Sequence, residues 1–224
     1  MSSTNRSNAR DEHISDYYVT PVSDIELFLE KFDKFYPLDW GCSKILDPCA
    51  GGNLEIRDGH GIKEAYHPMS YSTAIHNVFG EYCNVNNIDI RSDSLAETKG
   101  DYLTMDVKKF QPDIIITNPP FNLAVPIIEK AIEDVSDNGY VIMLLRLNFF
   151  GSQSREEFFK KYMPESVFVH HIRIGFTDKK DSNGYTVFDK DGNPRRGSTD
   201  SIEYMHAVWN KNNLQPGYTK LILV

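Results

Sequence analysis

Short apolar runs alternate with segments of helical periodicity along most of the chain. The apolar runs, each interpreted as a strand, span 43–46, 83–90, 113–117, 139–147, 166–174 and 203–209, and a further strand is expected shortly before Asp101. Apolar residues recur at helical spacing after Pro21 and in 71–79, 125–136 and 155–162. Strands that alternate with helices are typical of a mostly parallel sheet with crossover helices. The pattern therefore predicts an α/β fold.

The helix after Pro21 has Ser23 or Asp24 as its expected cap, with Ile25 and Leu29 on its buried face. Two stretches interrupt the pattern. Residues 58–71 lengthen the connection between the first two strands, and residues 177–200 form a long insertion rich in Gly, Asn and Asp. The insertion contains Tyr185, Val187 and Phe188, which indicate a small hairpin that contacts the substrate. Residues 1–16 are expected to be a polar tail, and residues 17–224 a single domain.

Four polar residues follow predicted strands, namely Asp47, Asp89, Asp101 and Asn118. Ligands of open α/β sheets bind at the carboxyl ends of the strands, where these side chains converge. An acidic residue after the second strand is well placed to accept hydrogen bonds from both hydroxyls of a ribose. The two glycines of DPCAGGN (47–53) let a ligand approach the backbone closely. We therefore expect a ligand site at this edge of the sheet.

Residues 117–122 read TNPPFN, and the two prolines end the preceding strand in a stiff turn. This turn suits a reaction at the exocyclic amine of adenine, whose lone pair is delocalised into the ring. If the Asn118 side-chain oxygen and the Pro119 carbonyl each accept one amine proton, the lone pair localises and can attack a methyl group. Pro119 and Pro120 fix the carbonyl direction, which is a form of preorganisation. Phe121 can stack on a base that has left the duplex, a contact worth about 1–3 kcal/mol.

Five motifs in this order resemble the S-adenosylmethionine-dependent DNA adenine-N6 methyltransferases, of the small kind found in phages and prophages. They are YYVTP (17–21), ILDPCAGGN (45–53), NIDIR (87–91), GDYLTMD (100–106) and IITNPPF (115–121). The resemblance implies a class I methyltransferase (Rossmann-like) fold. Such a fold has a seven-stranded, mostly parallel sheet, helices on both faces and an antiparallel strand near the edge. This chain departs from the family's sequence pattern at two places. Asn53 stands where the family commonly has a small residue, and the spacing from Asp47 to Asp89 is unusually long.

The resemblance also implies roles for individual residues. Thr20, with Tyr18 and Pro21 of the same YYVTP motif, would contact the methionine end of the cofactor, with Thr20 at the carboxylate. The methionine end would lie on Asp47, Pro48, Ala50 and Gly51, the ribose on Asp89, and the adenine on Asp101 and Tyr102. Asn118, Pro119 and Pro120 would hold the target amine, and Phe121 would stack on the target base.

Double-stranded DNA is the partner that the resemblance implies, and basic residues are the candidates to position its phosphates. These candidates are Arg146, Arg155, Lys160, Lys161, Lys179, Lys180, Arg195 and Arg196. The net charge of −8 argues against a protein that coats nucleic acid, but not against a local basic patch.

Composition also bears on the cellular compartment and on possible membrane or metal binding. Three cysteines without C-x-x-C spacing indicate a reducing compartment, the cytoplasm. The resemblance implies that this is the cytoplasm of a bacterium or a phage-infected host cell. No apolar run is long enough to span a bilayer, and the histidines match no zinc pattern, so neither a membrane nor a metal is expected.

Two alternatives stay open. The same amide chemistry serves methyltransferases that act on an RNA base amine or on a protein glutamine amide, although those enzymes usually carry an added recognition domain. A catalytically silent protein with this fold, binding nucleic acid or a partner, is the second alternative.

Overall fold

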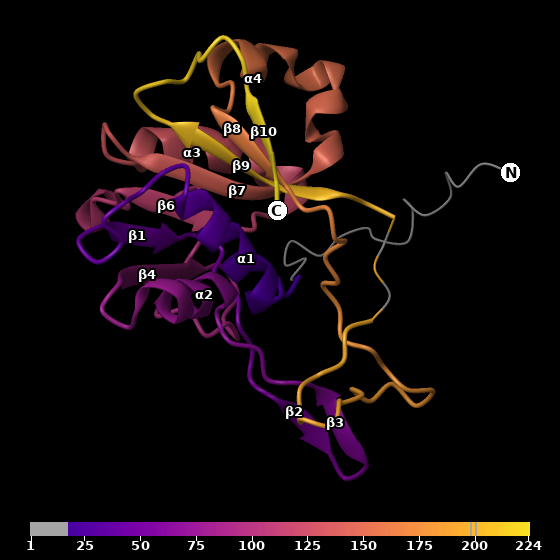
Figure 1. Ribbon diagram of the computed structural model, residues 1–224. Helices are drawn as coiled ribbons and strands as arrows, with labels where there is room; N and C mark the ends of the chain where they lie inside the picture. The colour runs from indigo at the N-terminus through magenta and orange to yellow at the C-terminus, as the bar shows by residue number, and fades with distance from the viewer. Residues whose placement is uncertain (1–17, 198, 200) are drawn as a thin grey trace, which may run out of the picture.

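An eight-stranded sheet forms the centre of the protein in the computed structural model, which describes residues 18–197, 199 and 201–224 (Figure 1). In chain order its strands are β1 (Lys44–Asp47), β4 (Asn84–Asp89), β5 (Thr98–Lys99), β6 (Ile114–Thr117), β7 (Tyr140–Arg146), β8 (Ser166–Val169), β9 (Tyr204–Asn210) and β10 (Lys220–Leu223). The helices are α1 (Val22–Asp33), α2 (Ser70–Phe79), α3 (Ala124–Asp134) and α4 (Glu156–Lys161). The predicted tail at 1–16 lies outside the described residues.

The strand order across the sheet is β10-β8-β9-β7-β6-β1-β4-β5. Only β9 runs antiparallel to its neighbours, so the mostly parallel sheet with one antiparallel strand near the edge is confirmed. The strand expected before Asp101 is β5, which pairs with the end of β4. The sheet has one strand more than the seven predicted, because β10 pairs in parallel with β8 at the outer edge. All the parallel strands thus present their carboxyl ends on the same side.

Two apolar cores cover the two faces of the sheet. Alternate side chains of β6 divide between them, with Ile114 and Ile116 packing under α1 and α2 and Ile115 packing under α3. The apolar periodicity of α1 is confirmed by the complete burial of Ile25 and Leu29. The predicted cap of α1 is wrong, since Pro21 precedes the helix and neither Ser23 nor Asp24 bonds back to its first turn. Both side chains instead bind Arg196, with Asp24 Oδ2 at 2.8 Å.

The two irregular stretches form one arm that projects from the body of the protein (Figure 1). The first contains the hairpin of β2 (Ile56–Asp58) and β3 (Gly61–Glu64). Residues 177–197 fold back on themselves through isolated bridges and then pack on this hairpin. The Thr186 amide donates to the Ile62 carbonyl at 2.7 Å, and the side chains of His67 and Asp178 lie 3.0 Å apart.

A buried polar chain crosses the core beneath β9. The Tyr71 hydroxyl lies 2.9 Å from His206 Nε2, and His206 Nδ1 lies 2.9 Å from His170 Nε2. The His206 ring also stacks on Phe28, with centroids 3.9 Å apart. Burial lowers the pKa of His170 to about 4 and lowers the pKa of His206 well below its ordinary value. Both rings are therefore neutral at neutral pH.

This burial makes part of the stability depend on pH. An unfolded histidine takes up a proton below pH about 6.5, whereas the folded protein must keep His206 neutral. The stabilisation is thus present above pH 6.5 and is lost as the pH falls towards 4. His206→Gln should lower the Tm at pH 7 by roughly 4–8 °C, since about 2 kcal/mol is lost and each kcal/mol shifts Tm by about 2–4 °C. That difference should shrink at pH 5. His60→Gln, an exposed control, should show no difference at either pH, and a constant gap for His206→Gln would contradict the assignment.

Candidate functional site

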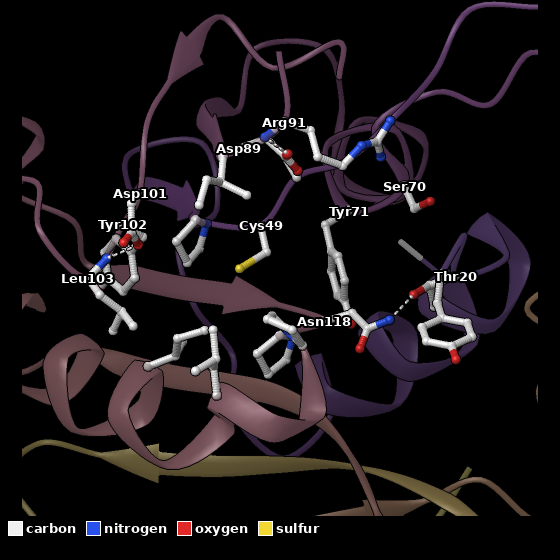
Figure 2. Close-up of a pocket in the computed structure, with 18 residues that line it drawn as sticks. Thr20, Cys49, Ser70, Tyr71, Asp89, Arg91, Asp101, Tyr102, Leu103 and Asn118 are labelled. Carbon is white, nitrogen blue, oxygen red and sulfur yellow. Dashed lines mark hydrogen bonds between the residues drawn. The ribbon is translucent and has the colours of Figure 1, made fainter. Parts of the chain in front are cut away.

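A pocket opens at the carboxyl ends of β1, β4 and β6, where the sequence placed a ligand (Figure 2). The predicted residues that line it are Tyr18, Thr20, Pro48, Ala50, Asp89, Asp101, Tyr102, Asn118, Pro119 and Pro120. It is also lined by Cys49, Ser70, Tyr71, Ile90, Arg91, Leu103, Leu123 and Ile127. Polar groups of several strand ends thus converge on a partly apolar cavity, which is the usual character of a small-molecule site.

Asp89 ends β4 and holds two loops of the pocket in place. Its Oδ2 accepts from the Gly51 amide at 2.7 Å, and its Oδ1 accepts from the Arg91 amide at 2.8 Å. A carboxylate offers about four acceptor positions, so each oxygen has capacity left for a ligand hydroxyl. The side chain can therefore accept from two vicinal hydroxyls, as a ribose presents them.

The glycine loop after β1 is shaped by its backbone. Gly51 and Gly52 adopt positive φ angles of 66° and 76°, which side-chain-bearing residues rarely adopt. A Cβ on Gly52 would also lie only 2.9 Å from the Leu95 side chain. Gly51 serves the site through its amide on Asp89 and does not itself line the pocket. Pro21, which precedes α1, does not line the pocket either.

Asp47 lies beneath the pocket floor and does not line the pocket, contrary to its expected position against the cofactor. It is fully buried, and its Oδ1 accepts from the Thr117 hydroxyl at 2.6 Å and from the Cys49 amide at 3.1 Å. Burial raises its pKa to about 7, against the lowering effect of these two bonds. Burial, followed by the negative charge of Asp47, also raises the pKa of the Cys49 thiol, which therefore stays protonated. Cys49 is thus no thiolate nucleophile.

Asp101 and Tyr102 form another wall of the pocket. Asp101 Oδ1 accepts from the Leu103 amide at 3.0 Å, which leaves Oδ2 for a ligand amine. The Tyr102 hydroxyl points away from any ligand and donates to Asp134 on α3 at 2.9 Å. Burial raises the pKa of Tyr102, so the pocket uses its ring and not an ionised phenol.

Asn118 follows β6 and connects the turn to the segment before α1 (Figure 2). Its Nδ2 donates to the Thr20 hydroxyl at 3.0 Å, and Thr20 is almost fully buried. The buried Asn118 Oδ1 has no hydrogen-bond partner among the described residues. A buried acceptor left without a donor is costly, so this atom suits a ligand N–H group. The Thr20 hydroxyl in turn keeps its own proton for a second ligand group.

Phe121 begins the short turn Phe121–Leu123 and is surrounded by other side chains. The Arg146 guanidinium carbon lies 4.5 Å from its ring centroid, and the rings of Tyr18 and Tyr204 lie at 6.2 and 5.9 Å. A base that stacked on Phe121 would therefore enter next to Tyr18 or displace Arg146.

The basic residues predicted to contact DNA divide into three groups. Lys180 and Arg196 are bound within the protein, Lys180 to the Lys63 carbonyl and to Thr186, and Arg196 to Asp24. Lys160 pairs with Glu156 and Glu157 of its own helix. Arg146 and Arg155, in contrast, line a common hollow beyond Phe121. No ion pair is found for the side chains of Lys161, Lys179 and Arg195 among the described residues.

The residues that sequence reasoning missed had weak signals. Arg91 stands two positions after Asp89, a spacing that could have suggested it. Tyr71 also lines the pocket, but it stands at the end of the irregular 58–71 stretch, so its position in the sequence did not place it near the glycine loop. Thr117 could be found only through its contact with Asp47 across neighbouring strands.

The part of the chain that the structure describes contains no cluster of three or more His, Cys, Asp or Glu side chains able to hold a metal ion. In the same residues, no helix has the length and apolarity needed to cross a membrane.

The raised pKa of Asp47 predicts a second dependence of stability on pH. A carboxyl whose pKa rises from 3.8 to about 7 on folding favours the folded state most below pH 3.8, and this is lost as the pH rises through 7. The Tm of the native protein should therefore fall relative to that of Asp47→Asn between pH 5 and pH 8. Asp137→Asn, which removes a carboxyl that is 95% exposed, serves as the control and should track the native protein. Parallel curves for native and Asp47→Asn would refute the raised pKa.

Comparison with known proteins supports the fold. No protein-family model and no curated protein matches the chain. Among solved structures, it is similar to a protein from Listeria monocytogenes assigned to the class I S-adenosylmethionine-dependent methyltransferases, with a TM-score of 0.54 and 14% identity over 92% of this chain and 65% of that one. An O-methyltransferase from Thermotoga maritima has a TM-score of 0.48 and 13% identity, over 84% of this chain and 64% of that one. The M protein of the type I restriction enzyme EcoKI has a TM-score of 0.43 and 10% identity, over 76% of this chain and 40% of that one. The chain thus spans just under two thirds of the length of the first of these, and its fold is that of the class I methyltransferases.

Proposed function

We propose that the chain binds S-adenosylmethionine in this pocket and transfers its methyl group to the N6 amine of an adenine turned out of duplex DNA. The observation that carries the proposal is the buried Asn118 Oδ1, an acceptor without a partner among the described residues, next to the Pro119 carbonyl. Two N–H groups of one amine match two fixed acceptors.

The residues of the pocket fit the cofactor. Asp89 has acceptor capacity left for both ribose hydroxyls, and Asp101 Oδ2 is available for the adenine amine. The Thr20 hydroxyl accepts from Asn118 and can donate its own proton to the methionine carboxylate. When bound, S-adenosylmethionine supplies an electrophilic methyl group on a sulfonium.

The protein's own contribution is orientation. Asn118 Oδ1 and the Pro119 carbonyl hold the two amine protons, which withdraws the nitrogen lone pair from the ring and directs it at the pocket. Pro119 and Pro120 keep the carbonyl from turning, so little rearrangement is needed at the reaction step. As the nitrogen–methyl bond forms, the sulfur–methyl bond would break and leave S-adenosylhomocysteine, and one amine proton would pass to solvent.

Methyl transfer from labelled S-adenosylmethionine tests the proposal. Unmethylated duplex DNA of varied sequence, RNA and a protein extract are offered in parallel, and the products are separated by nucleoside and amino-acid analysis. We expect label in N6-methyladenine of DNA. Label in RNA or glutamine alone would keep the amide chemistry and replace the substrate. Cofactor binding without transfer to any acceptor would favour a silent binding protein.

Two substitutions separate the acceptor side from the cofactor side. Asn118→Ala should lower methyl transfer by about 100-fold or more, as removal of a preorganised transition-state contact does, with cofactor affinity nearly unchanged. Asp89→Ala should weaken cofactor binding by roughly tenfold or more, because it removes the expected ribose contacts and the anchor of Gly51. Calorimetric titration with S-adenosylhomocysteine measures both affinities. Loss of binding in Asn118→Ala, or unchanged binding in Asp89→Ala, would contradict the division.

A further inference from the structure

A second hollow lies beyond Phe121, on the same turn as the pocket. Arg146, Arg155, Asn122, Asn148 and Ser152 supply its polar wall. Arg146 is the last residue of β7, so the hollow opens at the carboxyl edge of the sheet, next to the acceptor turn. No residue of the cofactor pocket lines it.

The Arg146 side chain is held by an aromatic ring, but its positive charge has no carboxylate partner among the described residues. Its guanidinium packs against the Phe121 ring at 4.5 Å, and its buried Nε has no hydrogen-bond partner among the described residues. No carboxylate of the described residues forms an ion pair with it. A buried guanidinium N–H without an acceptor is costly, and an anionic ligand would satisfy it.

Arg155 is fixed in a similar way on the neighbouring ring. Its guanidinium carbon lies 4.4 Å from the Phe149 ring centroid, and one terminal nitrogen donates to the Phe149 carbonyl at 2.8 Å. Its remaining N–H groups keep a defined direction, which suits bidentate binding of an oxyanion.

The charge of the hollow contrasts with that of the whole chain. Asp and Glu outnumber Lys and Arg by 32 to 24, yet no Asp or Glu is among the described residues that line this hollow. Two guanidinium groups, two amides and a hydroxyl thus face one space whose described lining contains no carboxylate. Two fixed cations with additional donors suit a phosphate.

We propose that this hollow binds a phosphate of the DNA strand that carries the target adenine. The inference rests on the proposed function and deepens it, since the phosphate would locate the strand while Asn118 receives the base. A phosphate subsite on the acceptor turn also makes a nucleic acid, not a protein glutamine, the substrate of the site.

Salt-dependent DNA binding tests the subsite. The slope of log Kd against log salt falls by about 0.9 for each duplex phosphate contact that is removed. Because both arginines face one phosphate, the double variant Arg146→Met/Arg155→Met should lower the slope for a labelled duplex by about 0.9, with unchanged affinity for S-adenosylhomocysteine. Lys220→Met, an exposed cation at the amino end of β10, is the matched control and should keep the native slope. Should the double variant not fold, Arg155→Met alone carries the comparison.

A second measurement locates the phosphate. Phosphates of a duplex that the native protein methylates are replaced one at a time by neutral methylphosphonate. One position should weaken binding of the native protein and leave Arg146→Met unaffected. If the native protein methylates DNA but every variant keeps the native slope, the subsite is refuted and the proposed function stands. If the native protein neither binds nor methylates DNA or RNA, the proposed function falls and this inference falls with it.

Discussion

A single buried hydrogen bond sets the geometry on which the site depends. Asp47 ends β1, Thr117 ends the adjacent strand β6, and the Thr117 hydroxyl donates to Asp47 Oδ1 at 2.6 Å. The same oxygen accepts the Cys49 amide, so the glycine loop and the acceptor turn begin from one carboxyl group. Because this contact is fully buried, water cannot replace it, and movement of one loop would disturb the other.

Asp89 repeats this arrangement one strand away. It joins the glycine loop, through Gly51, to the segment after β4, through Arg91. Asn118 adds a third connection, to Thr20 in the segment before α1. Four segments far apart in the sequence are thereby held around one pocket by side chains at strand ends. The parallel sheet matters for function because it brings those ends together.

Much of this arrangement could be predicted from local sequence. The apolar runs predicted β1, β4, β6, β7, β8 and β9. The polar residues at the ends of β1, β4 and β6 do meet at one edge, because that result requires only the parallel order of the strands. Contacts between distant segments could not be predicted. The packing of 177–197 on the β2–β3 hairpin joins residues more than a hundred positions apart, such as Thr186 and Ile62. β10 was not predicted, although residues 221–224 read LILV, because the run is only four residues long and its place in the sheet depends on pairing with the distant strand β8.

The site shows the same division. Asp89, Asp101 and Asn118 line the pocket, as their positions at strand ends predicted. Asp47 also stands at a strand end, but it lies beneath the pocket, where Thr117 binds it and Cys49 lies between it and the cavity.

A crystal structure of the protein with S-adenosylhomocysteine tests the central claim most directly, that one pocket joins a cofactor side to an acceptor turn. We predict the ribose hydroxyls on the Asp89 carboxylate and the sulfur facing Asn118, with Asn118 Oδ1 still without a partner. A ligand bound elsewhere, or a homocysteine amino group bonded to Asn118 Oδ1, would contradict it.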